Sequence, residues 1–183
     1  MHSVTAAITS IRLIELADAP ALAGHLMHDA QEFSRWDPPR PKEFRTTPGQ
    51  ASRIEQLLDI HDKGAGWPGV ILADGAVIGQ VTVSTILRGP FQKGFLGYWV
   101  ASTFQSQGHA TRAVGQALQV MTEELGLYRA EAHTRMENLA SQRVLRVNGF
   151  TTWGIAHAHI YLDGAWRDEV FWEKTLASGT PPQ

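Results

Sequence analysis

The strongest constraint on the fold of this chain is a strand pattern, a glycine turn and an amphipathic helix in direct succession. Residues 95–100 (FLGYWV) form the aromatic strand pattern, and residues 105–111 (QSQGHAT) carry a turn around Gly108. The helix that follows has apolar residues at every third or fourth position, namely Val114, Leu118, Met121 and Leu125. A helix start offers unpaired N–H groups and the positive end of the helix dipole, and a glycine lets the backbone approach an anion. The pattern therefore predicts a phosphate-binding turn for a ligand that carries a diphosphate.

Two common nucleotide sites are excluded at this turn by residue identity. A Walker loop requires Lys and then Ser or Thr after its last glycine, whereas Gly108 is followed by His109, Ala110 and Thr111. A dinucleotide fingerprint requires three spaced glycines, and this turn has Gly108 alone. We therefore expect neither ATP or GTP hydrolysis nor NAD binding.

Length and composition fit one globular domain. A chain of 183 residues with 43% hydrophobic and 19% charged residues can bury one sizeable core, and no apolar run approaches the ~20 residues of a membrane span. We expect one domain over residues 1–176 and a flexible tail over residues 177–183, where small, polar and proline residues gather. The first residues lack the features of a secretion signal, so we expect a soluble, cytoplasmic protein with no membrane partner.

The absence of cysteine and the charge balance exclude further classes. Without cysteine the chain has no disulfide, no thiolate metal ligand and no acyl-cysteine intermediate. A formal net charge of −2, with Lys and Arg scattered along the chain, gives no electrostatic footprint for nucleic acid. A basic protein partner stays open.

Periodicity along the chain predicts an α/β fold around one mixed sheet. Strands are expected at residues 11–16, 70–73, 77–83, 95–100 and 128–134, and again in the last part of the chain up to residue 174. Helices are expected after Asp18, at residues 48–62, from the phosphate turn to Leu125, and at residues 139–148. Asp18 would cap the first helix, whose apolar face would hold Leu22, Leu26 and Met27.

Two motifs resemble those of the GNAT N-acetyltransferases. Gln105, Gly108 and Ala110 fill the Gln/Arg-x-x-Gly-x-Gly/Ala signature, which holds the pyrophosphate of acetyl-CoA in that superfamily. Residues 138–150 (NLASQRVLRVNGF) resemble the segment of its RimJ/RimL-like branch that runs from Asn-x-x-Ser to Gly-Phe. Together they imply a single-domain GNAT fold, with a mixed, mostly antiparallel sheet that is flanked by helices and splayed at the acetyl-CoA site.

The resemblance extends over residues 11 to about 174. It includes the stretch at residues 34–38 (SRWDP), a central hairpin at residues 87–100 and a last hairpin at residues 161–168 with Asp163 and Gly164 at its turn.

The resemblance implies a donor site built largely from backbone. The amides of residues 107–111 would hold the pyrophosphate, and the side chains of Thr111 and Arg112 would add donors. Val100 and Ala101 would pair with the pantetheine arm and offer an N–H to the thioester carbonyl. Read from the sequence alone, Val100 is equally a buried strand residue. The residues assigned to acetyl-CoA are thus Val100, Ala101, Gln105, Gln107, Gly108, His109, Ala110, Thr111, Arg112, Asn138 and Ser141.

Proton transfer is assigned by the same resemblance, with alternatives left open. Ser141 matches the serine that protonates the departing thiolate, and Asn138 matches its neighbour near the cofactor; both would equally serve as helix caps. The Glu that the branch often carries after Gly-Phe is Trp153 here. His157 and His159 stand in the region of another acid, and an imidazole with a pKa of ~6.5 can act as a base or water relay. Strand alternation predicts both histidines on one face, where they would equally face solvent or a metal, although we expect no metal.

The acceptor side is expected to be aromatic. Phe33 and Trp36, with the prolines near them, would form one wall of a cleft, together with Trp99 and Trp153, and His109 would look into it. Aromatic residues beside a proline-rich loop also serve as plain packing.

The expected function is that of an acetyl-CoA-dependent N-acetyltransferase that acts by direct transfer on a primary amine, with a protein or peptide N-terminal amine suggested by the branch. One alternative acceptor is a small molecule such as an aminoglycoside, peptide antibiotic or polyamine, which Glu32, Asp37 and Glu43 would favour. Another alternative is a catalytically silent acyl-CoA-binding module, which Trp153 would favour. Longer donors such as succinyl-CoA stay open, and relatives suggest a homodimer.

Overall fold

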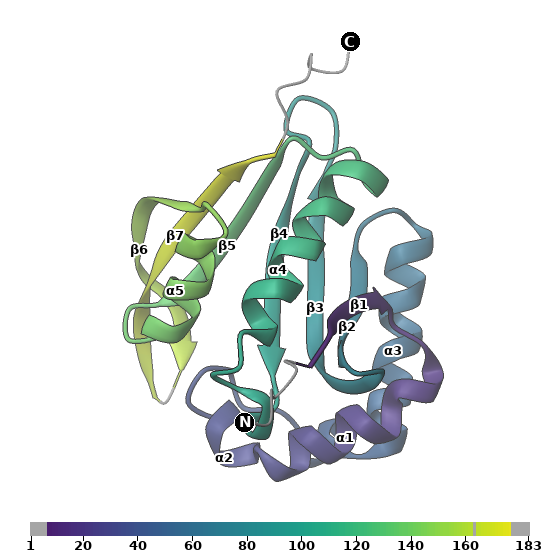
Figure 1. Ribbon diagram of the computed structural model, residues 1–183. Helices are drawn as coiled ribbons and strands as arrows, with labels where there is room; N and C mark the ends of the chain where they lie inside the picture. The colour runs from purple at the N-terminus through teal and green to yellow at the C-terminus, as the bar shows by residue number, and fades with distance from the viewer. Residues whose placement is uncertain (1–6, 163, 177–183) are drawn as a thin grey trace, which may run out of the picture.

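Apolar strands and amphipathic helices build one sheet with helices on both faces in the computed structural model, which describes residues 7–162 and 164–176 (Figure 1). The strands are β1 (Thr9–Leu13), β2 (Trp67–Ala73), β3 (Ala76–Leu87), β4 (Lys93–Val100), β5 (Arg129–Arg135), β6 (Thr151–Leu162) and β7 (Ala165–Thr175). The α-helices are α1 (Ala19–His28), α2 (Ala30–Phe33), α3 (Thr47–Asp62), α4 (His109–Gln119) and α5 (Leu139–Val147).

The strand order is β1-β2-β3-β4-β5-β7-β6, and β4 with β5 is the parallel pair among the described strands. The other neighbours pair antiparallel, as the short turn between β2 and β3 requires for that pair. The mixed, mostly antiparallel sheet expected from the sequence is confirmed.

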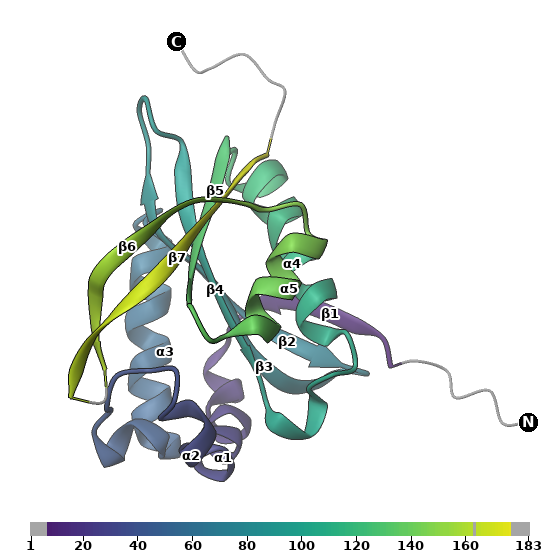
Figure 2. The ribbon, with the colours of Figure 1, turned by 90° about the vertical axis from the view of Figure 1, so that its left-hand side faces the viewer.

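The two faces of the sheet carry different helices (Figure 2). On one face α4 and α5 cover the larger core, in which Val114, Met121 and Leu145 are fully buried. On the other face α1 and α3 cover a smaller core, in which Leu22 and Ile54 are fully buried. Each such side chain contributes roughly 1.5–3 kcal/mol when it leaves water, so both layers are held firmly to the sheet.

The long central helix follows its predicted apolar stripe and then changes its winding. Val114 and Met121 are fully buried, and Leu118 is 9% exposed. The α4 hydrogen-bonding pattern gives way to a π turn over Val120–Glu124, and the chain leaves the helix at Gly126, whose φ is 58°. The helix predicted up to Leu125 is thus confirmed, with its last turn wound more widely.

Four local expectations need correction or lie outside the described residues. Met27 is 59% exposed rather than part of the apolar face, because the buried face of α1 is formed by Ala19, Leu22, Ala23 and Leu26. Asp18 occupies the N-cap position of α1, but its carboxylate binds Arg12 through two bonds of 2.7 and 2.8 Å instead of capping the helix. The predicted turn residue Asp163 and the tail at residues 177–183 lie outside the described residues.

Candidate active site

The parallel pairing of β4 with β5 is short, and it leaves a gap in the sheet (Figure 1). The strands pair only from Lys93 to Phe95 on β4 and from Arg129 to Glu131 on β5. Glu131 is 3% exposed and closes this joined end by accepting hydrogen bonds from Lys93 at 3.0 Å and from Arg129 at 2.7 Å. Beyond Phe95, β4 and β5 diverge, while the ion pairs of Glu131 hold them together at the paired end.

A cavity of about 1020 Å³ occupies the gap, with walls from strands β3, β4 and β5, from α2 and the loop after it, from the turn before α4, and from α5. Tyr98, Trp99 and Val100 are consecutive in β4, and all three line the cavity. Because adjacent strand residues point to opposite faces, the cavity extends through the sheet toward both helical layers. Two molecules can therefore meet in it from opposite faces.

Gly108 shapes the turn at which α4 begins. Its backbone is left-handed (φ 80°, ψ 2°), and a Cβ there would lie 2.7 Å from Nη1 of Arg112. The Gln105 side chain donates to the Val100 carbonyl at 2.9 Å and ties the turn to the end of β4. The first N–H groups of α4 have no partner within the helix, so they can bind an anion. The predicted turn residues that line the cavity are Gln105, Gly108, His109, Ala110 and Thr111.

Other predicted side chains support the turn from behind. The ring of His109 is 2% exposed, and its Nδ1 lies 2.8 Å from Oγ1 of Thr9. Arg112 donates from Nε to the same Oγ1 at 2.7 Å and from Nη2 to the Gln107 carbonyl at 3.0 Å. The Gln107 side chain donates to the Thr103 carbonyl at 3.1 Å. The His109 ring thus has its hydrogen-bond partner on β1, and that it faces an acceptor stays a prediction.

The protonation of His109 follows from these bonds. Arg112 can only donate, so Thr9 Oγ1 accepts from it and is free to donate its own hydrogen to Nδ1 of His109. Burial, and then the charge of Arg112, lower the pKa of His109. The imidazole is therefore neutral near neutral pH and adds no charge to the turn.

Val100 and Ala101 differ in what their N–H groups can reach. The Ala101 N–H donates to the Ile78 carbonyl at 2.8 Å, so a ligand cannot use it. Backbone N–H groups alternate between the two edges of a strand, which directs that of Val100 into the gap. Val100 is also 7% exposed and part of the larger core, so the structural and the ligand-facing interpretation both fit it.

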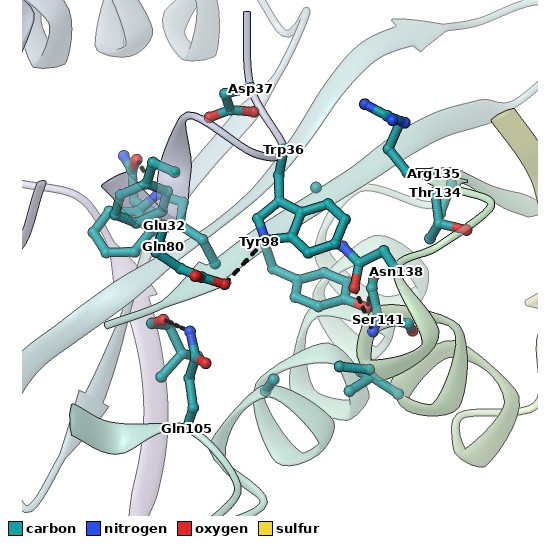
Figure 3. Close-up of a pocket in the computed structure, with 18 of the residues that line it drawn as sticks. Glu32, Trp36, Asp37, Gln80, Tyr98, Gln105, Thr134, Arg135, Asn138 and Ser141 are labelled. Carbon is teal, nitrogen blue, oxygen red and sulfur yellow. Dashed lines mark hydrogen bonds between the residues drawn. The ribbon is translucent and has the colours of Figure 1, made fainter. Parts of the chain in front are cut away.

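Ser141 lies in the first turn of α5 and faces β4 (Figure 3). Asn138 is the N-cap residue, and its Oδ1 accepts from the Ser141 N–H at 3.1 Å, so the capping interpretation of Asn138 is confirmed. The Ser141 hydroxyl lies 2.8 Å from the hydroxyl of Tyr98, which also reaches the Ser141 carbonyl at 3.1 Å. Both residues line the cavity.

Tyr98 is a site residue that was not predicted from the sequence. Burial raises its pKa to about 12, against a smaller lowering by its hydrogen bond with Ser141, so the phenol keeps its proton near neutral pH. It lies two residues before Val100, and strand alternation puts the two side chains on one face. That spacing is the signal from which the residue could have been found.

The opposite end of the cavity is lined by aromatic and charged side chains (Figure 3). Phe33 and Trp99 make an edge-to-face contact with ring centroids 5.0 Å apart, and Trp36 donates to Glu32 at 3.2 Å. These three predicted aromatic residues line the cavity, whereas Trp153 is 52% exposed and lies outside it, against Phe171.

Arginine and amide groups complete this end. Oε1 of Gln80 accepts from Arg53 at 3.0 Å and from Trp99 at 3.3 Å, which fixes the orientation of its amide. Removal from water raises the pKa of Asp37, against the opposing charges of Arg40 and Arg53. The rim is therefore mixed in charge rather than acidic. Glu32 and Asp37 belong to it, and Glu43 does not.

The two predicted histidines lie on opposite faces of the sheet. His157 binds Asp168 at 2.8 Å and is exposed, while His159 binds the next residue, Glu169, at 2.7 Å. Consecutive residues of β7 point to opposite faces, so the prediction that the histidines share a face is wrong. The cause is an irregularity in β6 at Ala158, where φ is 49°.

His133 and Glu169 were not predicted, and both line the cavity. Nδ1 of His133 lies 3.1 Å from one oxygen of Glu169, and His159 holds the other oxygen. Burial alone would raise the pKa of Glu169, but the hydrogen bonds from His133 and His159 leave it lowered. No local pattern marks this cluster, because its members come from three separate strands.

Across residues 7–162 and 164–176, no group of three or more His, Cys, Asp or Glu side chains is placed to hold a metal ion. No helix among them is long and apolar enough to cross a membrane.

Comparison with known proteins identifies a protein family that this chain matches. The model of an acetyltransferase (GNAT) domain matches residues 9–151. The chain is 31% identical over 160 residues to a probable N-acetyltransferase, YjcK, of Bacillus subtilis, an alignment that covers 86% of this chain and 88% of the relative.

Two solved structures share the fold and a substantial part of the sequence. Ribosomal-protein-S5-alanine acetyltransferase from Vibrio fischeri is 31% identical with a TM-score of 0.89, over 94% of this chain and 96% of that one. RimJ of Mycobacterium smegmatis, solved in complex with CoA-disulfide, is 30% identical with a TM-score of 0.90, over 93% of this chain and 83% of that one.

Proposed function

The chain belongs to the GNAT acetyltransferase family and is an acetyl-CoA-dependent N-acetyltransferase, and from that premise we propose that it acetylates the N-terminal amine of a protein by direct transfer. The observation that carries the proposal is a cavity that passes through the sheet, with backbone donors at one end and an aromatic, charged rim at the other. Donor and acceptor can meet in it without a covalent enzyme intermediate, and the chain has no cysteine to form one.

The donor end fits acetyl-CoA. The turn at Gly108 and the start of α4 offer N–H groups to the pyrophosphate, and the open edge of β4 offers the Val100 N–H to the thioester carbonyl. As the carbonyl becomes tetrahedral its oxygen gains negative charge. A backbone donor fixed toward that oxygen stabilises it, typically by a few kcal/mol.

Ser141 and Tyr98 suit protonation of the departing thiolate. Their hydroxyls are 2.8 Å apart, so a proton that leaves Ser141 can be replaced from Tyr98. Because the raised pKa of Tyr98 keeps its phenol protonated, the pair always holds a proton for the sulfur. We assign Ser141 as the general acid and Tyr98 as its support.

A protein N-terminus as acceptor is supported by the relative from Vibrio fischeri, which is a ribosomal-protein-S5-alanine acetyltransferase. The rim fits a peptide, because Arg53 and Trp99 hold Oε1 of Gln80 and leave its Nε2 without a partner among the described residues, beside aromatic rings. With such an acceptor the protein would act in the cytoplasm. Glu32 and Asp37 keep a cationic small molecule as the second candidate, since both carboxylates line the cavity.

The test is an acceptor panel with acetyl-CoA, read by thiol release and by mass spectrometry of the product. It compares peptides with a free N-terminal Ala or Ser, the same peptides with a blocked N-terminus and an internal Lys, a polyamine and an aminoglycoside. We expect the highest kcat/KM on free N-termini and one acetyl group on the α-amine. Preference for the polyamine or aminoglycoside would favour the small-molecule acceptor, and acetyl-CoA binding without turnover on any amine would favour a silent binding module.

A further inference from the structure

A buried carboxylate held between two histidines lies where the cavity meets β5 and β7, and from it we infer that His133 is the base that takes the proton of the incoming ammonium, with Glu169 as its positioning residue. The inference rests on the proposed N-acetyltransferase reaction and names the group that this reaction still lacks. Glu169 is 4% exposed, and both it and His133 line the cavity.

The hydrogen bonds fix which nitrogen of His133 is basic. An ionised carboxylate only accepts, so Nδ1 of His133 must donate to Oε1 of Glu169 at 3.1 Å. His159 donates in the same way to Oε2 at 2.7 Å. The neutral ring of His133 therefore carries its lone pair on Nε2, which is the nitrogen left for a substrate proton.

Aromatic rings hold the imidazole in place. Phe171 stacks on it with centroids 5.6 Å apart and planes 25° apart, and Phe95 meets it edge-on at 6.0 Å. A base with a fixed ring needs little reorganisation when it accepts a proton.

The charges around His133 favour the protonated ring once it forms. Glu169 of β7 lies against it, and the ring of His159 of β6, which binds the same carboxylate, meets the His133 ring edge-on with centroids 5.9 Å apart. On β5 itself, Glu131 and Arg135 stand two residues away on the same face, and Lys93 of β4 neutralises Glu131. Among the charged groups, the carboxylate of Glu169 is the one hydrogen-bonded to the ring, so a negative charge lies directly beside Nδ1.

The proton balance then closes. The ammonium gives one proton to Nε2 of His133, and the side chain of His133 is 42% exposed, so this proton can pass to solvent. The freed amine attacks the thioester carbonyl, the N–C bond forms, and the C–S bond breaks. Ser141 protonates the thiolate and takes a proton from Tyr98, and the second proton of the amine nitrogen, lost as the amide forms, restores this pair of hydroxyls through water. The products are the amide, CoA with a thiol and one released proton.

The test compares His133→Asn with the wild type on the best amine of the acceptor panel. The asparagine amide can still donate to Glu169 but has no basic nitrogen. We expect kcat/KM near neutral pH to fall about 100-fold or more, acetyl-CoA affinity to stay unchanged, and the acidic limb of the pH–rate profile to move to higher pH. The deficit should shrink at high pH, where the amine arrives neutral. His133→Gln provides a second variant should His133→Asn not fold.

The matched control is His157→Asn, which removes an exposed histidine that also pairs with a carboxylate on β7 and lies outside the cavity. It should keep the wild-type rate and profile. Glu169→Gln keeps an acceptor for Nδ1 of His133 but removes the charge, so it should lower kcat while KM for the acceptor and the affinity for acetyl-CoA stay unchanged.

The outcomes separate the two proposals. If the wild type acetylates an amine and both His133 variants keep its rate and acidic limb, the inference is wrong and the function stands. If Asp37→Asn changes the acidic limb of the pH–rate profile while both His133 variants retain it, the base is Asp37 and the inference is likewise wrong. If the wild type acetylates no amine while it binds acetyl-CoA, the function and the inference fall together.

Discussion

The two ends of the cavity differ in whether main-chain or side-chain groups face a ligand. At the α4 end, the atoms offered to a ligand are main-chain N–H groups, set by the turn at Gly108 and the end of β4. At the other end they are side chains from separate elements, including Asp37, Arg53, Gln80 and His133. Main-chain hydrogen-bond donors are set by the fold, whereas side chains can change while the fold persists. Recognition of the acetyl donor is therefore a property of the family, and recognition of the acetyl acceptor is a property of this sequence.

The largest effect should come from placing a charge at the main-chain end. Gly108→Glu puts a carboxylate where the pyrophosphate is expected and forces a side chain onto a left-handed residue. We expect acetyl-CoA affinity to fall on the order of 100-fold, measured by calorimetry.

Gly126→Glu is the matched control, because Gly126 also has a positive φ of 58° and a Cβ added there would have no atom within 4 Å. It carries the same backbone strain far from the turn. Equal loss of affinity in both variants would mean that strain, rather than the anion site, explains the effect.

The next effect concerns Ser141, where the two ends meet. Ser141→Ala should lower kcat roughly 100-fold with acetyl-CoA affinity unchanged, and Tyr98→Phe should lower it about 10-fold. Because the hydroxyls act in series, the double variant should resemble Ser141→Ala alone in a double-mutant cycle. Fully additive losses would show that Tyr98 does not act through Ser141.

A smaller effect is expected at the side-chain end. Arg53→Met removes the donor to Gln80 and should raise KM for the acceptor about 10-fold, with affinity for acetyl-CoA unchanged. Lys63→Met, at the exposed end of the same helix, is the control and should leave both constants unchanged. A change in acetyl-CoA affinity in Arg53→Met would show that the two ends are not independent.

The smallest effect is on stability. The folded-state pKa of Glu169 is lowered, so its contribution is present above the unfolded value of ~4.3 and is lost as the pH falls through the folded value. Glu169→Gln should therefore be less stable than the wild type near neutral pH, by on the order of 1 kcal/mol, and this difference should vanish in acid. Urea unfolding at both pH values measures it, and a difference that persists in acid would assign it to packing.

The contrast between main chain and side chains also explains what could be predicted from the sequence. The sheet, the α4 stripe and the turn at Gly108 follow from local periodicity and one glycine, and these predictions are confirmed as structure. Asn138 could be placed as a cap because a cap acts within one helical turn.

The remaining site residues depend on register between distant strands. Nothing local shows that His133 on β5 meets Glu169 on β7 across 36 positions of the chain. The irregularity at Ala158 likewise separated His157 from His159, although strict alternation joins them. Alternation is a local rule, and it fails across a bulge such as the one between Ala156 and Ile160, where β6 advances four residues while β7 advances two.

The buried Glu131 at the joined end of β4 and β5 has a consequence for the energetics of ligand entry. Its bonds to Lys93 and Arg129 anchor the strands on one side of the gap, so the opening beyond Phe95 exists before any substrate arrives. No sheet hydrogen bond between these two strands has to break for a ligand to enter the gap, and neither strand has to be reordered afterwards. A gap that is already built into the sheet lowers the entropic cost of association, so more of the intrinsic binding energy contributes to affinity.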